Sequence, residues 1–97
     1  MTDEQLVVAL ANYIDECNRA AERMHAANMA LDVAECAFDA SPTDANYWAR
    51  ERAERHFQWC AIRAGVADRA LKRAWEDAGG TPWQCLPPDA IIRVLPL

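Results

Sequence analysis

The chain has 97 residues, of which 53% are hydrophobic and 26% are charged, and its net charge is −5. A chain of this length fits one domain with a small core, which a partner often completes. Its longest apolar run, from Leu6 to Ala11, is far shorter than the about 20 residues that cross a bilayer, and no basic segment precedes it. We therefore expect one cytoplasmic domain over residues 1–97, without a membrane segment or a signal peptide.

The first predicted element is a helix over residues 3–40. Thr2 and Gln5 match a capping box, in which the two side chains satisfy each other's backbone N–H groups. No Gly or Pro follows until Pro42, and apolar or small residues recur at spacings of four and three. This heptad pattern is typical of a helix that packs along one seam. The seam positions are Leu6, Leu10, Tyr13, Cys17, Ala20, Met24, Ala27, Leu31, Ala34 and Phe38.

The second predicted element is a helix over residues 42–78. Ser41 is expected to cap it, with Pro42 and Asp44 in its first turn, where Pro is tolerated and an acid faces the positive helix end. Gly79 is expected to end it, since Gly readily takes the left-handed conformation after a helix. Its seam shows the same spacing. The positions are Ala53, Phe57, Cys60, Ala64, Ala67, Leu71, Ala74 and Ala78.

These elements predict an all-α fold built on a long antiparallel two-helix hairpin. The second helix begins almost where the first stops, so the two are antiparallel and facing positions have residue numbers that sum to about 84. Met24 then faces Cys60. The seam is rich in Ala, and a small residue at every seventh position lets the helices approach closely, as in a compact coiled coil.

Apolar residues also lie outside the seam, and residues 79–97 are predicted to form an extended, Pro-rich tail. Two hairpins that pair into a four-helix-bundle homodimer would bury these residues, and we favour this arrangement. The alternative is a monomer in which the tail folds back along its own hairpin. The residues expected to pack in one of these ways are Val33, Cys36, Ile62, Val66, Trp83, Ile91 and Ile92.

A second stripe on the later helix combines Trp and Arg, the residues most enriched at energetic hot spots of protein interfaces. One interpretation is a recognition face for a protein partner. A second is the core of the dimer with arginines at its edge, and a third pairs Arg52 and Arg55 with acids of the first helix. The stripe consists of Trp48, Arg52, Arg55, Trp59, Ile62, Val66, Arg69 and Arg73.

Charge is distributed unevenly along the chain. Residues 1–40 carry eight acidic and two basic residues, whereas residues 41–78 carry six acidic and seven basic ones. Asp32, Glu35 and Asp39 lie in a polar stripe of the first helix. This acidic surface is a candidate for docking on the basic groove of a nucleic-acid-binding partner, or it is a solvated face that keeps the protein soluble.

The sequence contains no catalytic motif, and we predict a non-enzyme without cofactor or metal. Glu22 and His25 spell the Glu-x-x-His element of di-iron bundles, but the second helix has no matching element. His56 and Cys60, one turn apart, supply only half of a metal site. The four cysteines are too widely spaced for a metal motif or a disulfide framework. They are Cys17, Cys36, Cys60 and Cys85.

Two functions from different classes follow. The first is a protein–protein interaction module that binds and modulates a larger host complex, since the chain resembles in size and acidity the small inhibitors of phages and mobile elements, anti-CRISPR proteins among them. The second is a nucleic-acid adaptor, because the hairpin resembles in topology the Rop-type proteins, which bind paired RNA. The net negative charge favours the first function, since phosphate binding depends on clustered positive charge.

Overall fold

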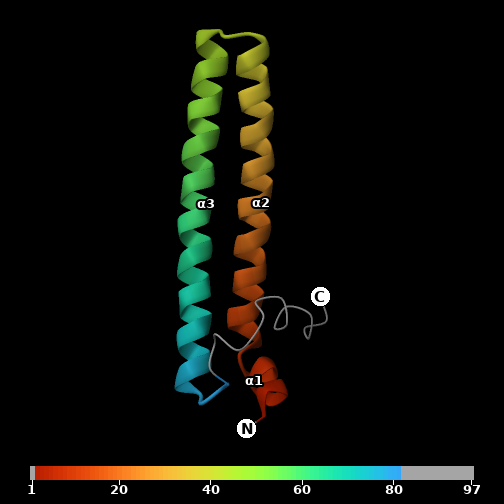
Figure 1. Ribbon diagram of the computed structural model, residues 1–97, viewed down its shortest axis with the longest axis vertical. Helices are drawn as coiled ribbons and strands as arrows, with labels where there is room; N and C mark the ends of the chain where they lie inside the picture. Colours follow the sequence, from red (N-terminus) through yellow and green to blue (C-terminus); the bar gives the residue numbers. More distant parts are fainter. Residues whose placement is uncertain (1, 82–97) are drawn as a thin grey trace. The chain divides into compact units, whose positions relative to one another are not determined.

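The computed structural model describes residues 2–81, and this part of the chain contains α-helices and no strand. The helices are α1 (Asp3–Ala9), α2 (Ala11–Ala40) and α3 (Asp44–Asp77). The two long helices, α2 and α3, pack against each other and are joined by a short turn, which confirms the helical hairpin (Figure 1). The predicted tail, with Trp83, Ile91 and Ile92, lies outside the described residues.

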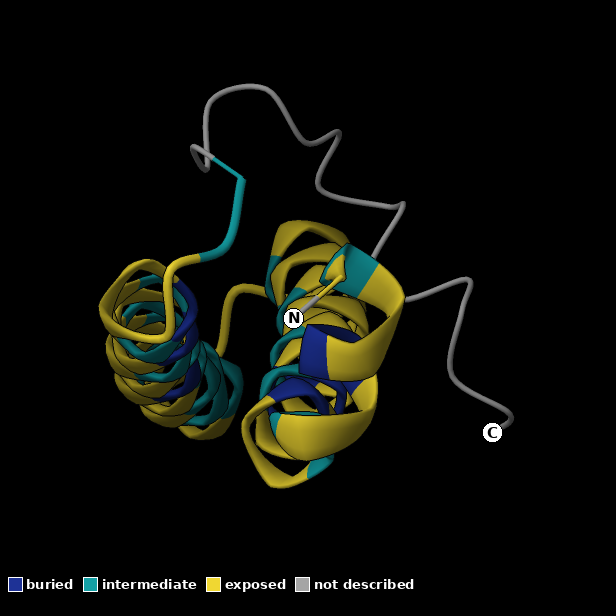
Figure 2. Ribbon diagram, turned by 90° about the horizontal axis from the view of Figure 1, so that it is seen from below, coloured by how far each residue is buried: buried dark blue, intermediate teal, exposed yellow. Residues whose placement is uncertain are grey.

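The predicted seam lies along the contact between the two long helices. Within residues 6–38, every seam position except Tyr13 is buried or half-buried. Within residues 53–74, every seam position is buried or half-buried. Ala20, Ala27 and Cys60 are buried, with at most 5% of their surface exposed. Figure 2 shows the exposed positions along the outer sides of the helices. The helices therefore meet through small side chains, as the heptad pattern predicts.

The chain forms two compact units. One comprises Met1–Arg19 together with Gly65–Leu97, and the other comprises Ala20–Ala64.

In the first unit, the capping box at the start of α1 is confirmed. The Thr2 side chain accepts a hydrogen bond from the Gln5 backbone N–H at 3.2 Å, and the Gln5 side chain accepts one from the Thr2 N–H at 2.9 Å. These bonds satisfy N–H groups that have no partner within the helix.

The prediction of one continuous helix over residues 3–40 is wrong, because the chain turns at Leu10 between α1 and α2. No Gly or Pro causes this turn. Leu6, Val7 and Ile14 are all at most 5% exposed, whereas Tyr13 on the predicted seam is 46% exposed. Leu6 and Val7 point about 100° apart on α1, and after the turn both pack in one cluster with Ile14. The gain in buried apolar surface explains why the helix is interrupted.

The core of the first unit joins α1 and the start of α2 to the end of α3. Leu6, Val7 and Ile14 pack with Leu71 and Trp75, and Trp75 is only 1% exposed. Leu10 and Cys17 pack against this cluster. The fully buried large side chains of the described chain are found here, so this unit contains the conventional hydrophobic core.

The segment after α3 is fastened to the start of α1. The Trp75 indole N–H donates to the Thr81 carbonyl at 2.8 Å, and the Thr81 N–H donates to an Asp3 carboxylate oxygen at 3.3 Å. The Thr81 hydroxyl also donates to the Asp3 carboxylate. Gly79 has φ 79°, which confirms its role after the helix, and the helix itself ends at Asp77 rather than at residue 78.

In the second unit, the turn is built differently from the prediction. Thr43 rather than Ser41 caps α3, because its hydroxyl accepts a hydrogen bond from the Asn46 N–H at 3.2 Å. The Asn46 side-chain amide donates to the carbonyls of Ser41 at 2.8 Å and Ala37 at 3.3 Å. Asn46 thus satisfies carbonyl groups at the end of α2, which fixes the turn and delays the start of α3 to Asp44.

Aromatic contacts beside this turn confirm the predicted register. The ring centroids of Phe38 and Tyr47, whose residue numbers sum to 85, are 6.0 Å apart in an edge-to-face arrangement. The Arg50 guanidinium carbon lies 4.3 Å from the centroid of the Phe38 ring, within the range of a cation–π interaction.

Two glycine substitutions test the packing around Trp75. In Gly80→Ala, the new Cβ would lie 2.3 Å from the Trp75 indole nitrogen, and the indole is buried and hydrogen-bonded. We expect a loss of about 1–3 kcal/mol in the free energy of unfolding, measured by urea denaturation. Gly65→Ala is the matched control, because a Cβ there meets only the flexible end of Arg69, and Ala in a helix interior should stabilise by about 0.5–1 kcal/mol. Equal effects of the two substitutions would contradict this packing.

Candidate protein-binding face

The Trp and Arg stripe predicted on the later helix lies on α3 and is exposed at every position. Trp48 is 54% exposed, Trp59 is 56% exposed and Ile62 is 60% exposed. Val66, Arg69 and Arg73 belong to the first unit and are also exposed. Exposure of two indoles within one stripe is unusual, because Trp loses much of its contact with water when a protein folds.

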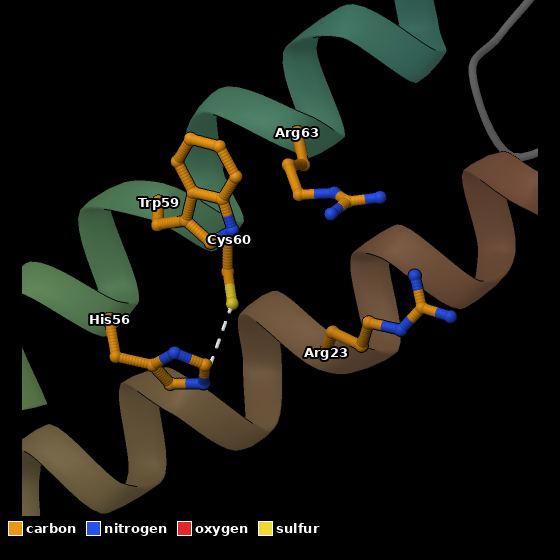
Figure 3. Close-up of a pocket in the computed structure, with 5 residues that line it drawn as sticks. All are labelled: Arg23, His56, Trp59, Cys60 and Arg63. Carbon is orange, nitrogen blue, oxygen red and sulfur yellow. Dashed lines mark hydrogen bonds between the residues drawn. The ribbon is translucent and has the colours of Figure 1, made fainter.

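Within the second unit, one hollow adjoins this stripe. It has a volume of about 350 Å³ and is lined by Arg23 of α2 and by His56, Trp59, Cys60 and Arg63 of α3 (Figure 3). Arg23 and Cys60 face the same space, as the predicted pairing of neighbouring Met24 with Cys60 requires. The hollow therefore lies beside the seam.

The side chains around the hollow combine positive charge with an aromatic wall. The Arg63 guanidinium carbon lies 5.9 Å from the centroid of the Trp59 ring, at the outer limit of a cation–π interaction. The His56 Nε2 atom lies 3.7 Å from the Cys60 Sγ atom. Cys60 is 5% exposed, whereas Trp59, His56 and Arg63 are exposed. The donors of Arg23 and Arg63, which come from opposite helices, suit an anionic group.

On α2, a row of small apolar residues continues from the hollow. Ala26, Ala30, Val33 and Ala37 follow Arg23 at spacings of three and four, so they share its side of the helix, and all four are exposed. On α3, the same spacing connects the hollow to Arg55, Arg52 and Trp48. We refer to this combined surface of the second unit as the Trp–Arg face. It comprises Arg23, Ala26, Ala30, Val33 and Ala37 of α2 and Trp48, Arg52, Arg55, Trp59 and Arg63 of α3.

The acidic residues singled out on the first predicted helix lie elsewhere on α2. Asp32, Glu35 and Asp39 are exposed, and their spacing places them on a different side from the alanines. Within residues 2–81, none of them forms an ion pair with Arg52 or Arg55. The interpretation in which Arg52 and Arg55 form ion pairs with acids of the other helix therefore finds no support in the described residues.

Other chemically notable groups are scattered. Among residues 2–81, no group of three or more His, Cys, Asp or Glu side chains could hold a metal ion. Glu22 and His25 are both exposed, and Cys36 is an exposed free thiol. In the first unit, burial and the neighbouring Asp68 raise the pKa of the Cys17 thiol from 9.0 to about 11. A thiol with such a pKa stays protonated at neutral pH and is a poor nucleophile.

Sequence reasoning found the α3 half of the Trp–Arg face but missed the α2 half. Single alanines give little hydrophobic signal, and the sequence predicts that Val33 packs in a dimer or against the tail. Arg23, His56 and Arg63 were not grouped as neighbours. The pairing rule that sets Met24 against Cys60 also brings Arg23 close to residues 60 and 61, so it could have predicted that Arg23 lies near Trp59 and Arg63.

In comparisons with protein-family models, curated proteins and solved structures, none matches this chain. None of the helices within residues 2–81 is both long and apolar enough to cross a bilayer.

The cysteines provide a test of this local chemistry. Cys17 should react with iodoacetamide at pH 8 at least about tenfold more slowly than exposed Cys36, because its raised pKa leaves little thiolate. Peptide mapping by mass spectrometry measures both rates, and in urea the two should become similar. The folded pKa exceeds the unfolded one, so the stabilisation associated with this thiol is present below pH 9 and is lost as the pH rises towards 11. Equal native rates would contradict the burial of Cys17.

Proposed function

We propose that this chain is a non-enzymatic protein-binding module of the cytoplasm, and that the Trp–Arg face contacts the partner. The observation that carries the proposal is the exposure of Trp48 and Trp59, at 54% and 56%, within one stripe that also contains arginines. Trp and Arg dominate measured binding energies at interfaces, because each combines a large apolar area with directional polar groups.

The packing of the two helices supports this proposal. The fully buried seam positions of the second unit, Ala20, Ala27 and Cys60, are small, and both indoles lie off the seam and are exposed. More than half of each indole side chain remains exposed to water, and this exposed area contributes no burial energy within the unit. Contact with another molecule gives these side chains an energetic role.

A module of this kind modulates a larger complex by occupying a surface that another component of the complex needs. Modulation by occupying a surface suits this face, because it is an exposed surface and not a catalytic site. Enclosure of a substrate is not part of the proposal, since the hollow beside Trp59 opens between exposed side chains.

Homodimer formation is a competing use of the same surface. A second hairpin over Val33 and Ile62, which are 71% and 60% exposed, would form the four-helix bundle. Analytical ultracentrifugation of the full chain separates the two uses, because a stable dimer that Trp59→Ala dissociates would assign the face to self-association.

The proposal is tested by capture of partners from host lysate with the tagged full chain, with and without nuclease. We expect one protein complex to be retained in both conditions, and Trp59→Ala to reduce its retention at least about tenfold. Tyr13→Ala is the matched control, because Tyr13 is an exposed aromatic residue of the other unit. Circular dichroism should show both variants folded, since exposed substitutions usually change stability by less than about 0.5 kcal/mol.

Two results would contradict the proposal. Capture that disappears after nuclease treatment would favour the nucleic-acid adaptor, with the arginines of α3 contacting phosphates. Capture that Trp59→Ala and Tyr13→Ala leave unchanged would place binding away from the Trp–Arg face.

A further inference from the structure

The Trp–Arg face has two unlike sides. The α2 side consists of small residues, namely Ala26, Ala30 and Ala37 with Val33, and all are exposed. Small side chains let the backbone of another helix approach closely. The α3 side is raised by the indoles of Trp48 and Trp59. A low apolar floor beside a raised aromatic wall is the geometry on which an amphipathic helix docks.

The distance between the two indoles along α3 also matches the repeat of a helix. Trp48 and Trp59 are eleven residues apart on one continuous helix, which corresponds to about three turns or roughly 16 Å. A partner helix that runs beside α3 repeats its apolar side at positions i, i+4, i+7 and i+11. Such a helix places one apolar residue near each indole and the intervening residues over the alanines.

The charge of the face indicates the charge expected on the partner's contacting segment. Four arginines lie on it, namely Arg23, Arg52, Arg55 and Arg63, although the whole chain has a net charge of −5. Helical spacing places Glu22 and Asp44 at the two ends of the face, four residues before Ala26 and Trp48. Glu51 lies within the face, four residues before Arg55, and forms an ion pair with Arg50 at 3.8 Å, so the arginines outnumber the acids there. The middle of the face is therefore positively charged and complements an acidic segment.

The hollow beside Trp59 is suited to one carboxylate of such a segment. Arg23 and Arg63 line it from opposite helices, and His56 supplies a further nitrogen. Guanidinium groups bind planar carboxylates with paired hydrogen bonds, which gives direction as well as attraction. The Trp59 ring next to Arg63 offers an apolar surface to the stem of the same acidic side chain.

Other occupants fit this surface less well. A second copy that docks through the same face would add four further arginines to the interface. A nucleic acid would find phosphate donors on α3 and at Arg23, but Ala26, Ala30, Val33 and Ala37 of α2 offer it only apolar contact.

We propose that the Trp–Arg face binds an acidic amphipathic helix of the partner protein, which lies along the floor of α2 beside Trp48 and Trp59 and places a carboxylate against Arg63 in the hollow. This inference rests on the proposed function and names the chemistry of the partner.

The test uses two synthetic helical peptides of about 20 residues, long enough to hold a helix in water. One carries Leu at positions i, i+4, i+7 and i+11 with Glu on both flanks, and the other has Gln in place of every Glu. Fluorescence anisotropy with the full chain measures the affinity of each. We expect the Glu peptide to bind at least about tenfold more tightly than the Gln peptide.

Substitutions in the chain locate the contact. Arg63→Gln should weaken binding of the Glu peptide about tenfold but change binding of the Gln peptide less than about twofold. Trp59→Ala should weaken binding of both peptides. Arg19→Gln is the matched control, because it removes the same charge from an exposed i,i+4 pair with Asp15 in the other unit and should leave both affinities unchanged.

The proposal is overturned if neither peptide binds, if the two peptides bind equally, or if Arg63→Gln and Arg19→Gln have the same effect. Tighter binding of a single-stranded oligonucleotide that is sensitive to Trp59→Ala would assign the face to nucleic acid instead. If lysate capture depends on Trp59 while the Glu peptide fails, the protein-binding function stands and only the acidic helix is rejected.

Discussion

The contact between α2 and α3 has small side chains at its most buried positions, and the other features of the second unit depend on this constraint. Ala20, at the boundary of the unit, is 4% exposed, Ala27 is 3% exposed, and Cys60 is 5% exposed. Close contact of two helix backbones gives dense packing but little buried apolar volume per residue. In this unit the large α3 side chain that lies on the seam, Phe57, is half-buried, whereas Trp48 and Trp59 lie off the seam and remain exposed.

The two compact units are stabilised by different kinds of contact. The first unit buries Leu6, Ile14 and Trp75 almost completely. The second unit relies on its alanine seam and on a turn in which Asn46 bonds two carbonyl groups of the preceding segment. A small chain has limited apolar surface to bury, and here the conventional core lies in one unit while the exposed indoles of the Trp–Arg face lie in the other.

Much of the helical architecture could be predicted from residue spacing. The capping box and the register that brings Phe38 beside Tyr47 follow from short-range rules. The turn at Leu10 could not be predicted in this way, because it arises from tertiary packing of residues on two sides of one helix. The candidate face was predicted only for α3, where Trp and Arg give a strong pattern. Its α2 half depends on alanines that become informative once their neighbours across the seam are known.

The bonds between Asp3 and Thr81 join positions 78 residues apart in sequence. They bring the beginning and the end of the described chain to the same place. A protein whose entry and exit points coincide can be inserted into a surface loop of a carrier without stretching either one. A segment cut at Asp3 and Thr81 is therefore suited to use as an inserted module, joined to the carrier at these two neighbouring positions.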